Sequence, residues 1–187
     1  TQAVRVIDAN KDRPFFMYLS YNAPHTPLHA KKSDYDALSA IDDHTERVYG
    51  AMVVALDRGI GRVMKALEEA GVDDNTLIVF LSDNGPEGNN IEFGLANNRE
   101  WLQERFDQSF ENMGRRNSYV TFSRGWAHVS AGAFSQYKSF LGEGGVRVPA
   151  IFSYPGQIQG NGYSQALMSI MDIAPTLMTF ADVPANP

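Results

Sequence analysis

Asp83 and Asn84 lie in the tetrapeptide SDNG (82–85), at the end of the apolar run 76–82. Their side-chain oxygens are hard ligands of the kind that Ca²⁺ and Mg²⁺ take in proteins. Ca²⁺ takes about six to eight oxygen ligands, so the other ligands would come from elsewhere. Because Asp-Asn-Gly is also a common turn sequence, a structural turn is the alternative interpretation.

His25 lies in the segment APHTP (23–27), between two prolines that stiffen the backbone. Imidazole gains and loses a proton near neutral pH, so a histidine held in place here could act as a general acid. The alternative is a solvated loop histidine. We interpret His29, four residues further on, as a surface residue.

A third cluster, YKSFLGEGGVRVP (137–149), combines Lys138 with an acid, paired glycines and an arginine. Lysine offers a point charge and glycine lets the backbone approach a ligand closely, so this segment could bind an oxyanion. A flexible entry loop with solvated charges is the alternative. Trp126 and His128 lie in the preceding polar stretch, where Trp126 could form a pocket wall or fill a local core.

Hydrophobic patterning indicates the elements that position these residues. The helix expected over 45–70 contains Gly59 and Gly61, which would permit close packing, and Gly71 is expected to end it. The run 76–82 is typical of a strand buried on both faces of a parallel sheet. The expected strands are 14–21, 76–82 and 146–154, and the expected helices are 45–70, 98–110 and 172–181, the last with Asp172 as its N-cap.

Strands alternating with helices predict an α/β, doubly wound sheet, in which ligands bind beyond the carboxyl ends of the strands. His25 and the pair Asp83–Asn84 follow two of the expected strands. The long stretch 85–135 is an insertion of a length that is usually functional or disordered.

The composition excludes several classes of protein. The 187 residues contain no cysteine, so disulfides, thiolate zinc sites and a cysteine nucleophile are absent from this sequence. The net charge is −6 and no basic stripe occurs, which argues against a nucleic-acid partner. No apolar run approaches the roughly 20 residues that a membrane span needs.

In order and spacing, these segments resemble the sulfatase family of the alkaline-phosphatase superfamily, and most of all its bacterial arylsulfatases. Within the long insertion, NSY (117–119) and WA (126–127) match as well, but His128 stands where arylsulfatases usually have Asn. The other matching segments are YNAPHTPL (21–28), ALDR (55–58), IVFLSDNG (78–85), YK (137–138), EGGVRVP (143–149) and DIAPT (172–176).

The resemblance implies that residues 1–187 are the central part of a sulfatase catalytic domain. The fold would be part of an alkaline-phosphatase-like sheet sandwiched by helices, incomplete in this chain. The family's nucleophile region would precede these residues, and its C-terminal subdomain would follow them. The remainder of the sulfatase polypeptide is therefore the expected protein partner.

The resemblance also implies an activity, the hydrolysis of small-molecule sulfate monoesters by a hydrated formylglycine beside one Ca²⁺ ion. Asp83 and Asn84 would be Ca²⁺ ligands, His25 the proton donor to the leaving oxygen, and Lys138 a charge stabiliser that also binds substrate. Trp126 and His128 would line the substrate pocket. Formylglycine arises from a Cys/Ser-x-Pro-x-Arg motif that this sequence lacks, so it is expected outside this chain.

Two alternatives remain at the level of sequence. Phosphate and phosphonate esters resemble sulfate esters in shape, so a hydrolase of the same superfamily acting on them is one. A non-catalytic, sulfatase-like binding module is the other, if this chain is the complete protein. The compartment is open between the cytoplasm and the periplasm of a bacterium.

Overall fold

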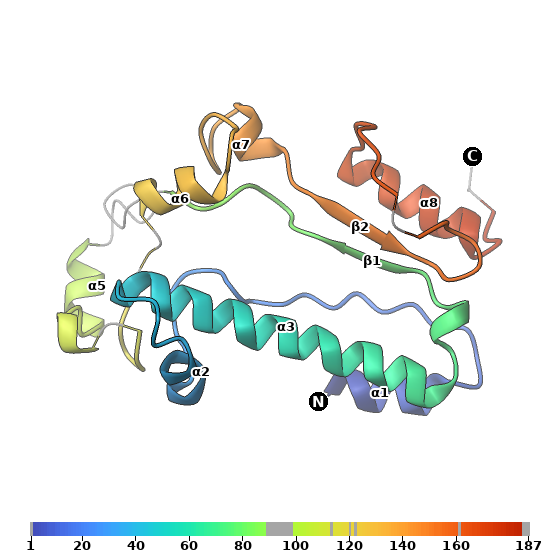
Figure 1. Cartoon of the computed structure of the whole chain (residues 1–187), viewed down its shortest axis with the longest axis horizontal. Helices are drawn as coiled ribbons and strands as arrows, with labels where there is room; N and C mark the ends of the chain where they lie inside the picture. Colours follow the sequence, from blue (N-terminus) through green and yellow to red (C-terminus); the bar gives the residue numbers. More distant parts are fainter. Residues whose placement is uncertain are drawn as a thin grey trace.

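A computed structural model describes residues 2–88, 99–112, 114–119, 121, 123–160 and 162–184. Figure 1 shows the long helix α3 beside α1, with a two-stranded sheet next to them and α8 beyond the sheet. The helices are α1 (Gln2–Asn10), α2 (Lys32–Ala37), α3 (His44–Ala70), α5 (Arg99–Arg105), α6 (Arg124–Ser130), α7 (Glu143–Val146) and α8 (Ile173–Phe180); the strands are β1 (Ile78–Leu81) and β2 (Ala150–Ser153); the 3₁₀ turns are η1 (Asp73–Asn75), η2 (Phe110–Asn112) and η3 (Ile170–Asp172).

The helix α3 confirms the expectation for 45–70 and is about 40 Å long at 1.5 Å per residue. Asp43 caps its first turn, where the carboxylate accepts a hydrogen bond from the Glu46 N–H. Gly71 ends it in the left-handed region at φ 67°. Of Gly59 and Gly61, the first permits close packing, because a Cβ there would lie 3.0 Å from the Tyr21 ring, whereas the second faces open space.

Two hydrophobic clusters hold the other elements against α3. The first core cluster consists of the buried residues Leu28, Val48 and Met52, and it joins the 22–31 loop to the N-terminal half of α3. The second core cluster consists of Ile7, Ala66 and Leu67, and it joins α1 and β1 to the C-terminal half. The long helix is therefore the common support of both ends of the molecule.

The expectation of a buried strand over 14–21 is wrong for the described residues. This segment is extended but pairs with no described strand. Its alternating side chains face two ways: Phe15 and Met17 pack on the second core cluster, whereas Phe16 and Tyr18 are 76% and 82% exposed. The segment has apolar side chains on both faces, but the described chain covers only the face with Phe15 and Met17.

The sheet also differs from the expected parallel arrangement around 76–82. β1 pairs with β2 in antiparallel register, from Ile78 opposite Ser153 to Leu81 opposite Ala150. Phe80 and Ile151 remain 44% and 60% exposed, because the described elements cover the faces of this two-stranded sheet only in part. The architecture is nevertheless α/β, with helices on both sides of the sheet (Figure 1).

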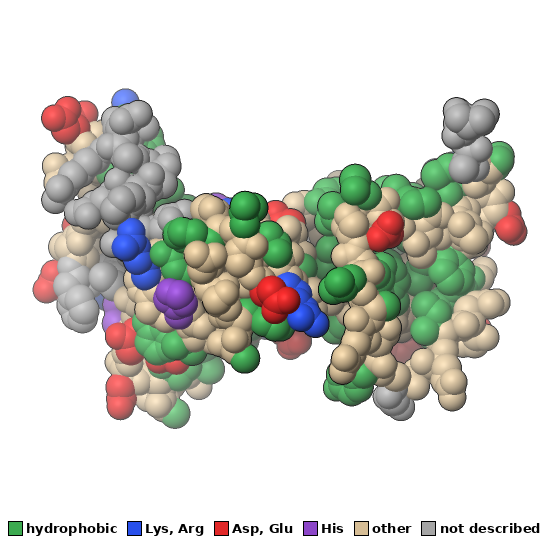
Figure 2. All heavy atoms as spheres, turned by 90° about the horizontal axis from the view of Figure 1, so that it is seen from above, with side chains coloured by type: hydrophobic (Ala, Val, Ile, Leu, Met, Phe, Trp, Pro, Cys, Tyr) green, Lys and Arg blue, Asp and Glu red, His purple; other side chains and the backbone are tan. Residues whose placement is uncertain are grey.

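The end of the molecule around α8 is rich in exposed apolar side chains. Figure 2 shows these hydrophobic side chains gathered over one half of the surface. They include Leu167, Met168, Ile170 and Met171, which are between 52% and 86% exposed. None of the described helices is both long and apolar enough for a membrane span.

Candidate functional site

The backbone brings Asp83 and Asn84, which follow β1, against the loop that contains Lys138. The Gly85 N–H donates to the Gly145 carbonyl at 3.1 Å. The Lys138 N–H donates to the Pro86 carbonyl at 3.0 Å. Two of the three clusters in the sequence, SDNG and YK…EGGVRVP, are therefore parts of one site.

Glycines make this close approach possible. A Cβ at Gly85 would lie 1.9 Å from the Gly144 carbonyl oxygen, and a Cβ at Gly144 would lie 2.1 Å from the Gln136 carbonyl oxygen. Both distances are far below van der Waals contact, and both neighbouring atoms belong to the backbone. The glycines therefore bring one backbone segment against another, whereas the close approach of backbone to a ligand stays a prediction. Residues 143–146 form the short helix α7 rather than a flexible entry loop.

The oxygens of Asp83 and Asn84 suit a hard cation in kind but not in number. Asp83 is exposed, and its carboxylate has no partner among the described residues. The Asn84 Nδ2 donates to the Gly85 carbonyl at 2.9 Å, which leaves the Asn84 Oδ1 as a potential ligand. In the part of the chain that the structure describes, no group of three His, Cys, Asp or Glu side chains could hold a metal ion. These residues fit a Ca²⁺ site that takes further ligands from elsewhere.

Lys138 has a partner that the sequence analysis missed. Its Nζ lies 3.5 Å from the Glu87 carboxylate, and both side chains are a little over one quarter exposed. Glu87 therefore restrains the lysine charge close to the Asp83–Asn84 segment. The only available signal was an acid four residues after Asp83, and nothing in the sequence links it to position 138.

His128 joins the same group through Tyr137. The two rings meet edge to face with centroids 5.1 Å apart, and Tyr137 is buried. Trp126, on the same short helix α6, is half-buried and packs against the first core cluster. Trp126 was expected either to form a pocket wall or to fill a local core, and its contact with the first core cluster is that of a core residue.

His25 is exposed on the 22–31 loop, and its ring orientation is defined. Its Nδ1 lies 2.6 Å from the Thr26 carbonyl oxygen. Because a carbonyl only accepts hydrogen bonds, Nδ1 bears the proton and Nε2 is the nitrogen left for another group. No hydrogen bond or ion pair of the described chain joins His25 to Asp83 or Lys138. The loop and Trp126 are linked by the first core cluster, on which Ala23 also packs.

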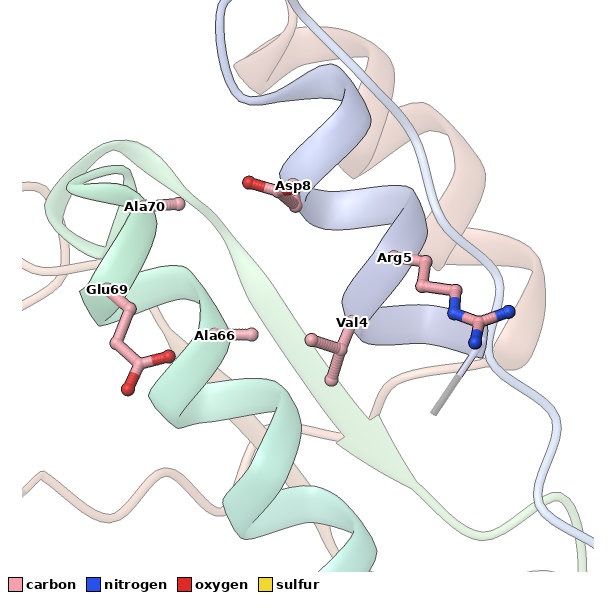
Figure 3. A pocket seen from close by; sticks show the side chains of 6 residues that line it. All are labelled: Val4, Arg5, Asp8, Ala66, Glu69 and Ala70. Carbon is pink, nitrogen blue, oxygen red and sulfur yellow. The ribbon is translucent and has the colours of Figure 1, made fainter.

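The hollow in Figure 3 lies between α1 and α3, toward the end of the molecule away from α6 and α7. Its volume is about 220 Å³, and it is open to solvent. Its lining includes one arginine, two carboxylates and two alanines, and these side chains do not have the arrangement of a catalytic or metal site. The lining residues are Val4, Arg5, Asp8, Ala66, Glu69 and Ala70.

Comparison with known proteins gives a consistent result. The Sulfatase family profile matches residues 1–183. The arylsulfatase of Klebsiella aerogenes is 30% identical over 224 residues, which cover 94% of this chain and 48% of that enzyme. An uncharacterized sulfatase of Schizosaccharomyces pombe is 31% identical over 235 residues, covering 97% of this chain and 42% of the relative.

A solved structure, Ps i-CgsB in complex with k-i-k-neocarrahexaose, matches with a TM-score of 0.72 and 32% identity. The match covers 99% of this chain and 33% of that one. The fold is therefore the alkaline-phosphatase-like α/β fold of sulfatases, represented in part. The chain belongs to the sulfatase family, and it spans less than half the length of the two curated relatives.

Proposed function

We propose that the full-length protein is an arylsulfatase-type sulfuric ester hydrolase, with residues 1–187 as the central part of its catalytic domain. The observation that supports this most is the backbone pairing that holds Asp83 and Asn84 against Lys138. It joins oxygen ligands for a cation to a positive charge, which is what binding a tetrahedral oxyanion requires. The arylsulfatase relative favours sulfate esters over the phosphate or phosphonate alternative.

Asp83 and Asn84 would supply part of the shell of one Ca²⁺ ion, with the other ligands on the remainder of the sulfatase polypeptide. When bound, the ion would offset the negative charge of the sulfate oxygens. The formylglycine nucleophile would also lie on the remainder, since this sequence has no Cys/Ser-x-Pro-x-Arg motif.

His25 and Lys138 would act on the bridging oxygen, which gains negative charge as the S–O bond breaks. The protonated His25 would donate the Nε2 proton, because its Nδ1–H is held by the Thr26 carbonyl. Lys138, restrained by Glu87, would stabilise the charge and bind substrate. Trp126 and His128 would border the pocket on the side of α6. The substrate would be a small sulfate ester. The similarity to Ps i-CgsB in complex with k-i-k-neocarrahexaose supports a sulfate ester of a saccharide.

The test uses the full-length protein with nitrophenyl sulfate and a nitrophenyl phosphonate. We expect sulfate turnover that falls on chelation and returns with Ca²⁺. We also expect losses of about 10²-fold or more in Asp83→Ala and Lys138→Ala. Arg62→Ala, an exposed change on α3, is the control and should keep full activity. Turnover of the phosphonate alone would favour the superfamily alternative, and no turnover of either would favour a binding module.

A further inference from the structure

Three aromatic rings form a row on the long insertion, which in the sequence separates the SDNG segment (82–85) from the segment that contains Lys138. The ring centroids of Trp101 and Phe106 are 5.5 Å apart, and those of Phe106 and Tyr119 are 5.3 Å apart. Phe106 and Tyr119 are half-buried, but Trp101 is 41% exposed. The guanidinium of Arg105 lies 5.4 Å from the Trp101 ring centroid. This end of the row is an exposed aromatic ring with a guanidinium over one of its faces.

Two further arginines, Arg115 and Arg116, lie on the turn beside this row, and both are exposed. Within the described ranges, no carboxylate forms an ion pair with them or with Arg105. The neighbouring acid Asp107 is engaged elsewhere, because its carboxylate accepts from the Ser109 N–H. Hydrogen bonds from the Ser109 side chain, first, and from its N–H lower the pKa of Asp107. The positive charge of the three arginines is therefore available to a ligand.

The backbone of this turn is fixed with respect to the aromatic row. The Asp107 N–H, next to Phe106, donates to the Asn117 carbonyl at 2.8 Å. Asn112 donates its Nδ2 hydrogens to the carbonyls of Asp107 and Arg116 at 3.1 and 3.4 Å. Ser118 is fully buried and donates to the Arg115 carbonyl. A preformed surface loses less conformational entropy when it binds.

The same turn is attached to the loop that contains His25. The Ala30 N–H donates to the Gly114 carbonyl at 3.3 Å. His29 is exposed, as expected of a surface residue, and its Nε2 donates to the Ser118 carbonyl at 2.9 Å, which joins the loop to the turn. Figure 1 shows α5 at the end of the molecule where α2 and the start of α3 lie. The turn that carries Arg115 and Arg116 is therefore held against the loop that carries His25.

We infer that Trp101, Arg105, Arg115 and Arg116, here named the arginine–aromatic face, bind a sulfated saccharide unit next to the unit being hydrolysed. The indole face suits the C–H face of a sugar ring, and guanidinium groups bind sulfate oxygens with paired hydrogen bonds. With a net charge of −6 and only three arginines, the face fits isolated sulfate groups better than a nucleic-acid backbone. This inference rests on the proposed function.

The first experiment compares two substrates in the full-length enzyme. The variants are Arg115→Ala/Arg116→Ala and Trp101→Ala, with Trp101→Phe as the conservative change and Arg62→Ala as the matched charge control. The substrates are sulfated hexasaccharides of the carrageenan, chondroitin and heparin types. For the hexasaccharide that the wild type prefers, we expect KM to rise about tenfold in the double arginine variant and in Trp101→Ala. The KM and kcat for nitrophenyl sulfate should not change, and Trp101→Phe should retain most of the affinity.

An equal loss on the saccharide and on nitrophenyl sulfate would overturn the inference, since it would mean a structural role. So would an unchanged KM for all three hexasaccharides.

The second experiment is calorimetry with the same hexasaccharides and with desulfated versions, and it does not depend on turnover. Sulfate-dependent binding that is lost in the double arginine variant is the expected result, even if the protein proves to be inactive. If the proposed function fails, turnover is absent but sulfate-dependent binding remains, so the two failures can be told apart. Equal binding of desulfated chains, or preferential binding of single-stranded DNA, would overturn the subsite.

Discussion

The hydrogen bond from the His25 Nδ1 to the Thr26 carbonyl determines which ring nitrogen can meet a substrate. If the Nε2 proton goes to the leaving oxygen, His25→Ala in the full-length enzyme should slow poor leaving groups more than good ones. General acid catalysis contributes about 10²–10⁴-fold, and a weakly basic phenolate gains least from it. The measurement is a series of aryl sulfates with phenols of graded acidity, on wild type and on His25→Ala.

Lys138→Ala should show the same trend, because a nearby cation also stabilises the leaving oxyanion. An identical dependence on the leaving group in wild type and His25→Ala would remove His25 from the acid role. It would then be assigned to sulfate binding or to the structure of the loop.

Gly85 is the residue where an added methyl group should do most harm to the site. In Gly85→Ala the new Cβ would meet the Gly144 carbonyl at 1.9 Å, so the two backbones would separate. We expect a loss of about 1–3 kcal/mol in the free energy of unfolding and weaker Ca²⁺ binding by the full-length protein. Urea denaturation and calorimetry measure the two effects.

Gly61→Ala on α3 is the matched control, because no atom lies within 4 Å of its Cβ position. It should stabilise the protein by up to about 1 kcal/mol through helix propensity. If both alanine variants behaved alike, the close approach at Gly85 would be unimportant.

Between elements, α2 is fixed to α3 by an ion pair with unequal burial. The Arg58 guanidinium lies 2.5 Å from the Asp34 Oδ1, and the two side chains are 40% and 7% exposed. Among the described residues the Asp34 Oδ2 has no hydrogen-bond partner, so Arg58 is the main compensation for a buried charge. Arg58→Ala should therefore destabilise the protein by about 1–3 kcal/mol, a range reduced for the exposure of the arginine.

Arg62→Ala lies one turn further along α3 and should change the free energy of unfolding by less than about 0.5 kcal/mol. Chemical denaturation of both variants makes the comparison. Equal stability of the two would show that solvent, rather than Arg58, compensates the Asp34 charge.

The elements that the sequence predicted well are those specified by neighbouring residues. The periodic apolar face and Gly71 located α3 to within one residue at its start. Asp172 occupies the N-cap position of α8 as expected, but its carboxylate accepts from the Ser169 N–H. The helix expected over 98–110 is shorter, ending at Arg105, and Asn98 is outside the described residues.

What depends on distant segments could not be read from the sequence. The run 14–21 has the composition of a buried strand, but burial needs neighbours that the described chain does not provide. The ion pair between Arg58 and Asp34 likewise joins two different helices, so it could not be read from the sequence. In the site, the glycines indicated a close approach of backbone, but the segments that they bring together and the pairing of Lys138 with Glu87 required the fold.

For the whole molecule, the exposed side chains of the 14–21 segment are the surface that we expect the remainder of the proposed full-length sulfatase to cover. Phe16 and Tyr18 are more than three quarters exposed, a state that globular proteins seldom keep for a contiguous apolar face. In hydroxyl-radical footprinting, both should be modified in the isolated 187-residue chain and protected in the full-length protein. The isolated chain should also fail to hydrolyse nitrophenyl sulfate, because it lacks a Cys/Ser-x-Pro-x-Arg motif.

Trp101 is the internal control, since it should be modified in both forms. Equal modification of Tyr18 in the two proteins would place the remainder elsewhere. Turnover by the isolated chain, lost in His25→Ala, would contradict the need for a second region.

The hydrogen bond between the Lys138 N–H and the Pro86 carbonyl has a consequence for how such enzymes diversify. It brings the two ends of the insertion together at its base, so the parts of the insertion that do not pack on the first core cluster or on the 22–31 loop can vary in length without moving β1 or β2. The entropy of closing a loop grows only slowly with its length, so longer or shorter inserts cost little stability. An insertion from a relative, exchanged between these two points, should give a folded chimera. That chimera would keep the reaction of one parent and the substrate range of the other.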